Sequence, residues 1–171
     1  MRPLTLHTPK PLLKVAICPL IEHHIVKLAS AGIKDIVINV SWLGQKIIEY
    51  LQDGSQFGVN ITYSIEENEP LETAVGIKKA LPMLTNDTDD YFLVVNGDIF
   101  SNFDFNQVIE IEKQTKDFHN AYLWLVKNPK HNQKGDLALV KDHVKNLPFN
   151  GAASLTFSGI GLYRPSFFND C

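Results

Sequence analysis

The sequence predicts a protein of the α/β class, with a mostly parallel sheet and helices on both of its faces. Helical patterns and short apolar runs alternate along residues 19–95, and alternation with short connections is typical of βαβ units. The apolar runs are continuous, as in Ile36-Val37-Ile38, which is expected of strands that are covered on both faces.

Each element of the first half has its own signals. Helices are expected over residues 19–31, 42–53 and 71–81, and strands over 34–40, 59–64 and 91–95. Gly32 and Gly54 follow the first two helices, where glycine commonly closes a helix. Pro82 is expected to end the third helix, because its ring clashes with the preceding turn. The strand 91–95 looks the most deeply buried.

After residue 100 the pattern changes to a mixed α+β half. It predicts one helix over residues 105–115 and three strands over 120–127, 136–140 and 155–163. One long polar loop is expected over residues 128–135. With 171 residues, of which 44% are hydrophobic and 20% charged, the chain is long enough for a single domain with a sizeable core. We therefore expect one domain over residues 1–171.

Charge and cysteine content exclude several classes of protein. The formal net charge is −3 and no basic cluster appears, which argues against a nucleic-acid partner. Cys18 and Cys171 are too few for a disulfide framework. No apolar run approaches the length of a membrane span or a signal-peptide core. We expect a cytoplasmic protein without a membrane partner.

Lys10 is a candidate phosphate ligand. Pro3, Pro9 and Pro11 exclude a regular helix or a central strand and predict a rigid loop. Lys10, between two of these prolines, would hold an ammonium group in a fixed position against phosphate oxygens. The alternative is a solvated lysine in a proline-rich terminus, and residues 1–13 alone do not decide between the two.

Asn96-Gly97-Asp98 directly follows the strand 91–95. Ligands of open α/β sheets bind beyond the carboxyl ends of the strands. Gly97 allows a ligand to approach the backbone closely, and the Asp98 carboxylate suits Mg²⁺, which prefers few carboxylates together with phosphate oxygens and water. The alternative is an ordinary turn, since these residue types favour turns. A phosphate-seeking Lys10 elsewhere in the chain favours the site.

Glu69-Pro70-Leu71-Glu72-Thr73 leads into the third helix. Amide donors and the positive dipole at a helix N-terminus would suit a nucleobase or a phosphate. Glu72 and Thr73 are also good residues for the first turn of a helix, so helix capping is the competing explanation. His23 and His24, adjacent in the helix 19–31, point to different faces and are expected at the surface rather than in a metal site.

Several short motifs resemble those of the sugar-1-phosphate nucleotidyltransferases in order and approximate spacing. They are Arg2-Pro3-Leu4-Thr5, Thr8-Pro9-Lys10-Pro11-Leu12, Pro19-Leu20-Ile21-Glu22, Leu71-Glu72-Thr73 and Asn96-Gly97-Asp98. Three further motifs are similar to those of the bacterial uridylyltransferases that act on N-acetylmuramate 1-phosphate in cell-wall recycling. They are Trp42-Leu43-Gly44-Gln45, Asn128-Pro129-Lys130-His131 and Thr156-Phe157-Ser158-Gly159-Ile160.

This resemblance implies a Rossmann-like nucleotide-diphospho-sugar transferase fold and transfer of a nucleoside monophosphate, with UTP as the expected donor, to a sugar 1-phosphate. It implies that residues 1–100 bind the nucleotide and residues 101–171 the sugar. Lys10 and Asp98 would be catalytic, and Asp98 would bind Mg²⁺. The nucleotide would contact Arg2, Pro70, Glu72, Thr73, Asn96 and Gly97, and the sugar Gly135, Asp136 and Gly159.

Family members also carry segments that this sequence does not show. They begin with an apolar strand and a glycine-rich loop ending in arginine, and Met1 stands directly after that place. A later metal-binding aspartate would follow Cys171. We therefore expect a domain truncated at both ends that lacks the first strand, has little or no activity, and self-associates at the exposed flank of its sheet.

Two other hypotheses belong to different classes. A non-catalytic subunit of the same fold would bind a sugar phosphate or nucleotide, or serve in a regulatory assembly. A different Rossmann-type enzyme is disfavoured, because no Gly-x-Gly-x-x-Gly motif follows a predicted strand.

Overall fold

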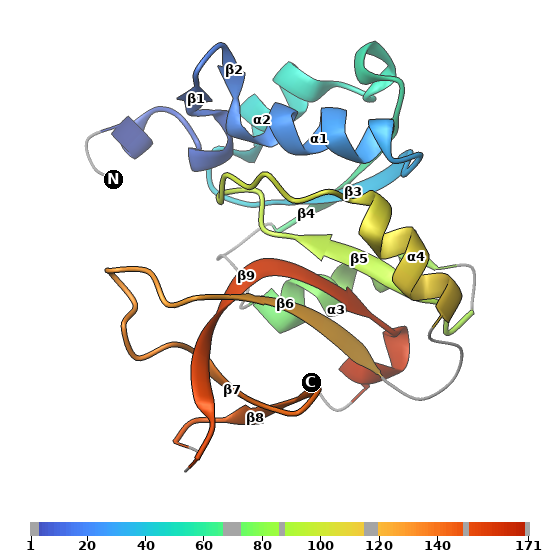
Figure 1. Cartoon of the computed structure of the whole chain (residues 1–171). Coiled ribbons are helices and arrows are strands. Elements are labelled where there is room, and N and C mark those ends of the chain that lie inside the picture. Colours follow the sequence, from blue (N-terminus) through green and yellow to red (C-terminus); the bar gives the residue numbers. More distant parts are fainter. Residues whose placement is uncertain (1–3, 67–72, 86–87, 115–119, 149–150, 170–171) are drawn as a thin grey trace.

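The computed structural model describes residues 4–66, 73–85, 88–114, 120–148 and 151–169. The alternation predicted for the first half is confirmed (Figure 1). Its elements are α1 (Leu20–Ser30), β3 (Asp35–Val40), α2 (Gly44–Leu51), β4 (Asn60–Ile65), α3 (Thr73–Leu84) and β5 (Phe92–Val95). Every one of these elements overlaps the helix or strand expected from the sequence.

The proline-rich segment before α1 contains more local structure than a plain loop. Two single turns of 3₁₀-helix, η1 (Leu4–Leu6) and η2 (Lys10–Leu12), precede a short hairpin of β1 (Lys14–Val15) and β2 (Cys18–Pro19). A 3₁₀ turn needs only one or two i to i+3 hydrogen bonds, so prolines that would interrupt an α-helix are compatible with it. The hairpin is not predicted by the sequence pattern.

The expected end of the third helix at Pro82 is wrong. Pro82 lies inside α3, which continues to Leu84, and the Thr85 amide donates to the Leu81 carbonyl across the proline. In the last turn of a helix a proline removes a single hydrogen bond, and the turns before it remain intact.

The second half is the expected mixture of one helix and several strands. It consists of α4 (Asn106–Gln114), β6 (Ala121–Val126), β7 (Leu137–Val140), β8 (His143–Asn146), β9 (Ala153–Tyr163) and η4 (Pro165–Phe168). β8 was not predicted. All four of its residues are exposed, so it carries none of the apolar periodicity by which strands are recognised in a sequence.

Strand pairing divides the described residues into separate sheets. β3 and β4 pair in parallel. A second sheet has the order β5-β9-β7-β8, with β6 also paired to β9, and its strands are antiparallel. Parallel pairing among the described residues is therefore confined to β3 and β4. Among the described residues, β3 and β5 are not hydrogen-bonded to each other.

Helix α1 joins the two sheets through the hydrophobic core. Ile21 and Ile25 belong to a cluster with residues of β3, α2 and β4, whereas Leu28 belongs to a cluster with β9 and α4. In Figure 1, α1 and α2 lie above β3 and β4, and α3 lies below β5. Among the described residues, no helix is both long and apolar enough to cross a membrane.

Candidate active site

Lys10 is held by a rigid local framework. Pro9 precedes η2 and Pro11 lies within it, and the amide of Leu12 donates to the Pro9 carbonyl at 2.9 Å. Leu12 packs against the core cluster of α1, α2 and β3. Since the backbone on both sides of Lys10 is fixed, its side chain leaves the fold from a defined position, as the sequence predicts.

Asp98 lies in the turn that follows β5, and the loop around it is anchored on two sides. The Asn96 amide donates to the Gly159 carbonyl of β9 at 2.8 Å. On the other side, the Nε2 atom of His24 is 2.6 Å from the carbonyl oxygen of Ile99. Asp98 is therefore presented from a loop whose backbone is connected both to α1 and to the central strand of the second sheet.

The structure brings Lys10 and Asp98 together across 88 positions of sequence. The Lys10 Nζ atom donates to Asp98 Oδ2 at 2.5 Å, and both side chains are more than a third exposed. An ion pair of such exposure contributes only about 0–1 kcal/mol to folding. A polar pair on two anchored segments is therefore better explained by binding than by stability.

Among the described residues, the Asp98 carboxylate is the group at this turn that could bind a divalent cation. Among the described residues, no group of three or more His, Cys, Asp or Glu side chains is arranged to hold a metal ion. Mg²⁺ usually keeps several waters and binds one or two carboxylates together with phosphate oxygens. The Asp98 carboxylate therefore fits a cation that arrives with a polyphosphate.

Gly97 keeps its surroundings open. Its φ is not in the left-handed region, and a Cβ atom there would approach nothing nearer than Ile21 Cδ1 at 4.0 Å. Neither conformation nor crowding therefore requires glycine at this position. Thr73 is exposed at the start of α3 and lines the same cavity as Asn96, Gly97 and Asp98. Arg2, Pro70 and Glu72 lie outside the described residues.

Gly159 packs directly against the loop that carries Asp98. Its φ is +80°, and a Cβ atom would lie 2.9 Å from Asn96 Cβ and 2.7 Å from Ile99 Cδ1. Glycine is therefore required here by both conformation and space. This contact connects a predicted sugar-side residue with a predicted nucleotide-side residue.

Gly135 and Asp136 lie beside a more upstream part of β9. Gly135 has a φ of +71°, and a Cβ atom would lie 2.9 Å from the Leu155 carbonyl oxygen. The Asp136 carboxylate accepts from Asn132 Nδ2 and from the Phe157 amide, each at 2.9 Å. Both carboxylate oxygens of Asp136 are thus already engaged in holding the loop between β6 and β7 against β9.

Sequence analysis missed the polar network that supports this loop. Asn128 Nδ2 donates to the Ser154 carbonyl at 3.2 Å, and the Thr156 hydroxyl donates to Asn128 Oδ1 at 2.9 Å. Asn132 Nδ2 lies 3.2 Å from the Thr156 hydroxyl. The polar character of residues 128–135 was the available signal, although it could not indicate which strand these side chains would contact.

The expected surface position of His24 is wrong. Its side chain is only 4% exposed, and burial, the largest cause, lowers the pKa of its imidazole below the ordinary value of 6.5, with smaller lowering contributions from Lys27 and His23. The Nε2 atom meets the Ile99 carbonyl, while Nδ1 has no hydrogen-bond partner among the described residues. His24 is a positioning residue for the Asp98 loop, and only three-dimensional placement reveals this.

Comparisons with known proteins identify the family. The sequence profile described as nucleotidyl transferase matches residues 1–135. N-acetylmuramate alpha-1-phosphate uridylyltransferase of Neisseria meningitidis serogroup B is 49% identical over 169 residues, which cover 99% of this chain and 72% of that protein. Mannose-1-phosphate guanyltransferase of Yarrowia lipolytica is 42% identical over 115 residues, covering 67% of this chain and 31% of that enzyme.

A solved structure shows the same fold. A Bacillus anthracis protein described as a glucose-1-phosphate thymidylyltransferase, in complex with a sucrose, superposes with a TM-score of 0.82 at 24% identity, covering 98% of this chain and 68% of that one. The fold is thus that of nucleotide-diphospho-sugar transferases. The chain belongs to the nucleotidyl transferase family. Within that family it is related to the sugar-1-phosphate nucleotidyltransferases.

Proposed function

We propose that this domain belongs to an enzyme that transfers UMP from UTP to N-acetylmuramate 1-phosphate and releases pyrophosphate. The contact between Lys10 and Asp98 carries the proposal, because it places one cation and one carboxylate at the carboxyl end of β5. The choice of substrates is supported by the 49% identity to the uridylyltransferase of Neisseria meningitidis. We assign the reaction to the cytoplasm and to recycling of cell-wall sugars.

The chemistry requires no protein nucleophile. A phosphate oxygen of the sugar phosphate attacks the α-phosphorus of UTP, a new P–O bond forms there, and the bond to the oxygen that bridges the α- and β-phosphorus breaks, so that pyrophosphate leaves with that oxygen. Catalysis then consists of orienting the two substrates and neutralising their charge. Mg²⁺ held through Asp98 would supply Lewis-acid neutralisation of the phosphates when it is bound.

In this proposal Lys10 exchanges partners when the nucleotide binds. Without nucleotide its ammonium neutralises the Asp98 carboxylate. With nucleotide, the ammonium binds phosphate oxygens, and the released carboxylate would hold Mg²⁺. Because the pair is half-exposed, little stability is lost when it opens.

We assign Thr73, Asn96 and Gly97 to the nucleotide, with residues 1–100 as the nucleotide-binding half. The half from 101 to 171 binds the sugar, with Gly135 and Gly159 shaping its side of the site. Asp136 acts by holding the loop between β6 and β7 in place, since both of its oxygens are engaged there. Arg2, Pro70 and Glu72 remain assigned to the nucleotide on the basis of the resemblance alone.

Calorimetric titration with UTP in the presence of Mg²⁺ tests the site directly. Lys10→Met and Asp98→Asn are each expected to weaken UTP binding about 10- to 100-fold, as expected when a charge-assisted contact of about 1.5–3 kcal/mol is removed. Lys14→Met and Asp90→Asn remove the same charges from exposed positions and are expected to leave binding unchanged. Equal affinity in all four variants would refute the assigned site.

The relation to mannose-1-phosphate guanyltransferases provides a second candidate donor, GTP. Titration with GTP under the same conditions separates the two, and tighter binding of GTP than of UTP would replace the proposed donor. A form extended by the amino-terminal strand and loop of the family decides between enzyme and binding subunit. Release of pyrophosphate by that form, in the presence of UTP, N-acetylmuramate 1-phosphate and Mg²⁺, identifies an enzyme.

A further inference from the structure

The segment that carries Lys10 is attached to the start of helix α1. The Leu13 amide donates to the Lys10 carbonyl at 3.1 Å, and the Leu20 amide donates to the Leu13 carbonyl at 3.0 Å. Leu20 is the first residue of α1, and the hairpin of β1 and β2 lies between these two leucines. The position of Lys10 is therefore defined relative to α1.

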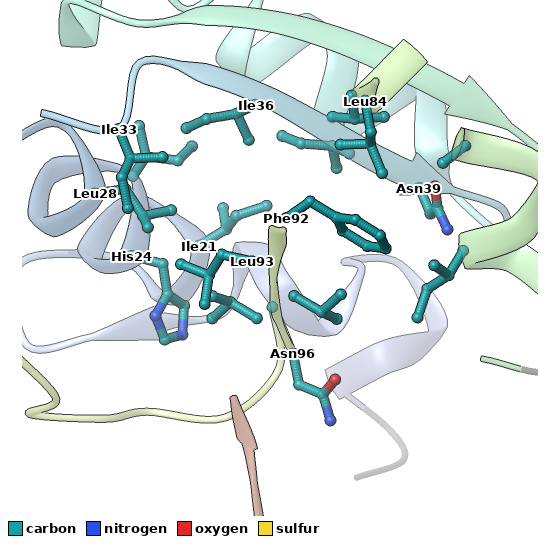
Figure 2. A pocket seen from close by; sticks show the side chains of 18 of the residues that line it. Ile21, His24, Leu28, Ile33, Ile36, Asn39, Leu84, Phe92, Leu93 and Asn96 are labelled. Carbon is teal, nitrogen blue, oxygen red and sulfur yellow. The ribbon is translucent and has the colours of Figure 1, made fainter. Parts of the chain in front are cut away.

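The loop after β5, which carries Asp98, is attached to one face of the same helix. The Nε2 atom of His24 meets the Ile99 carbonyl at 2.6 Å, and Lys27 Nζ donates to the Ser101 carbonyl at 2.5 Å. His24 and Lys27 are three positions apart and therefore lie on the same face of α1. Figure 2 shows the His24 imidazole extending from α1 toward the loop. The helix thus holds this loop at two backbone positions.

Phe100, which lies between these two positions, contacts α1 through its side chain. Its ring meets the imidazole of His23 edge to face, with centroids 5.4 Å apart and an interplanar angle of 88°, a geometry that stabilises aromatic pairs. Lys27 Nζ lies 5.8 Å from the centroid of the same ring, within the range of a cation–π contact. Phe100 is 49% exposed, so these directed contacts from α1, and not burial in the core, fix its ring.

His23 also contacts the hairpin that follows Lys10. Its Nε2 atom lies 2.8 Å from the Val15 carbonyl oxygen in β1 and 3.2 Å from Cys18 Sγ in β2. Because a carbonyl oxygen can only accept a hydrogen bond, Nε2 carries the proton and donates to Val15. One imidazole thus connects the hairpin after Lys10 with the ring of Phe100.

The contact between Lys10 and Asp98 depends on such connections. Both side chains are more than a third exposed, and an ion pair of this kind is too weak to hold two segments together. Val15 lies five residues after Lys10, and Phe100 lies two residues after Asp98. His23 therefore links the two segments close to the groups whose separation matters. Misplacement of such a group by about 1 Å can cost about 100-fold in rate.

We propose that His23 is a positioning residue that sets the separation of Lys10 and Asp98 by holding the hairpin and Phe100 at the same time. Both contacts are needed on one side chain, because either contact alone leaves the hairpin and the loop unconnected at this point. The consequence for catalysis rests on the proposed function, in which this pair binds UTP and its cation. The separation itself does not, and it can be measured without substrate.

Carbodiimide cross-linking of the 171-residue chain reports the contact between Lys10 and Asp98. The reagent activates a carboxylate, and an amine in direct contact with that carboxylate forms an amide bond while the reagent leaves as a urea. Mass spectrometry of proteolytic peptides gives the yield of the Lys10–Asp98 amide after a fixed time. Circular dichroism checks that each variant is folded at the temperature of the reaction.

Three substitutions of His23 separate its two contacts. His23→Gln keeps a donor for the Val15 carbonyl but lacks the ring, and His23→Phe keeps a ring but lacks the donor. Loss of one such contact is expected to lower the yield about 2- to 10-fold. His23→Ala is expected to lower it by a similar factor, because a connection is broken when either end is lost. A wild-type yield in His23→Gln or His23→Phe would overturn the proposal. A loss in His23→Ala equal to the product of the two single losses would also overturn it, since the contacts would then act independently.

Phe100 provides an independent test at an exposed position. Phe100→Leu removes the aromatic ring and is expected to lower the yield about 2- to 10-fold, whereas Phe100→Tyr keeps the ring and is expected to retain the wild-type yield. Val26→Ala, at a 48% exposed position of α1, is the control and is expected to change nothing. Equal yields in the two Phe100 variants would overturn the proposal even if the His23 variants do not fold.

Calorimetric titration with UTP and Mg²⁺ separates this proposal from the proposed function. His23→Gln and Phe100→Leu are expected to bind UTP about 2- to 10-fold more weakly, and Phe100→Tyr is expected to bind it as tightly as the wild type. If Lys10→Met and Asp98→Asn bind UTP normally, the proposed function fails, and the cross-linking yields still decide the role of His23. Unchanged yields together with weaker UTP binding would mean that His23 affects the nucleotide by another route, and would overturn the positioning role.

Discussion

Replacing Gly159 by alanine tests whether β9 positions the loop of Asp98. A Cβ atom at this position would lie 2.9 Å from Asn96 Cβ. Because Asn96 Cβ is attached to the backbone, it cannot rotate away, and the loop or the strand has to move. Gly151→Ala is a closely matched control, since Gly151 has a φ of +81° but, among the described residues, no atom within 4 Å of the added Cβ.

The two substitutions share one cost and differ in another. A left-handed conformation costs alanine about 1–2 kcal/mol, which reduced freedom of the unfolded chain offsets by about 0.4–1 kcal/mol. Gly151→Ala is therefore expected to destabilise by about 1 kcal/mol. Overpacking adds about 1–3 kcal/mol, so Gly159→Ala is expected to cost about 3 kcal/mol in total.

Thermal unfolding followed by circular dichroism measures the difference. At about 2–4 °C per kcal/mol for a domain of this size, Gly151→Ala is expected to lower Tm by about 2–4 °C and Gly159→Ala by about 6–12 °C. Gly159→Ala is also expected to weaken UTP binding at temperatures where it remains folded, because the clash displaces the loop that carries Asp98. Equal losses of Tm in the two variants would refute the inferred contact.

Three further predictions concern other parts of the fold. The pKa of buried His24 is lowered in the folded state, so folding favours its neutral form. The contribution of this group to the free energy of unfolding is fully present above pH 6.5. It is lost as the pH falls below that value, and the free energy of unfolding then decreases by up to about 1.4 kcal/mol per pH unit. Urea denaturation between pH 7.5 and 5 is expected to show this slope in the wild type but not in His24→Leu, and parallel curves would contradict it. The hydroxyl of Tyr50 donates to Glu22 Oε2 at 2.5 Å, and this hydrogen bond is the main cause that raises the pKa of Tyr50 to about 12. Glu22→Gln is expected to return this pKa toward 10 in a titration of phenolate absorbance. An unchanged pKa would exclude the hydrogen bond as the cause. Leu51 is fully buried, and Leu51→Ala is expected to lower the free energy of unfolding by about 2–5 kcal/mol in urea denaturation. Leu139 is 38% exposed, so Leu139→Ala is expected to lower it much less. Similar losses in the two variants would contradict the packing of Leu51.

The fold could be predicted where apolar periodicity is strong. β3, α2 and β5 each carry continuous or helically spaced apolar residues, and each forms close to its expected bounds. Periodicity does not identify β8, whose residues are all exposed, and its strand follows from pairing with β7. Pro82 was assigned too strong an effect, because local preference matters least in the last turn of a helix.

The candidate site was predictable in its residue types but not in its supports. Lys10 and Asp98 stand at informative places in the sequence, between two prolines and directly after a strand, although each also has a structural explanation when it is taken alone. That they touch is a property of the tertiary structure. The contributions of His24 and Gly159 depend on contacts over 75 and 63 positions of sequence, to Ile99 and Asn96 respectively, and no local pattern contains that information.

The position of β9 has a consequence for biosynthesis. Residues 153–163 provide the pairing partner for β5, β6 and β7 alike. As the chain leaves the ribosome from its amino end, those three strands emerge first and have to wait for the segment that unites them. The β3–β4 unit, whose strands are separated by a short helical crossover, can assemble earlier. Translation speed and chaperone access around residue 150 should therefore affect the second sheet much more than the first.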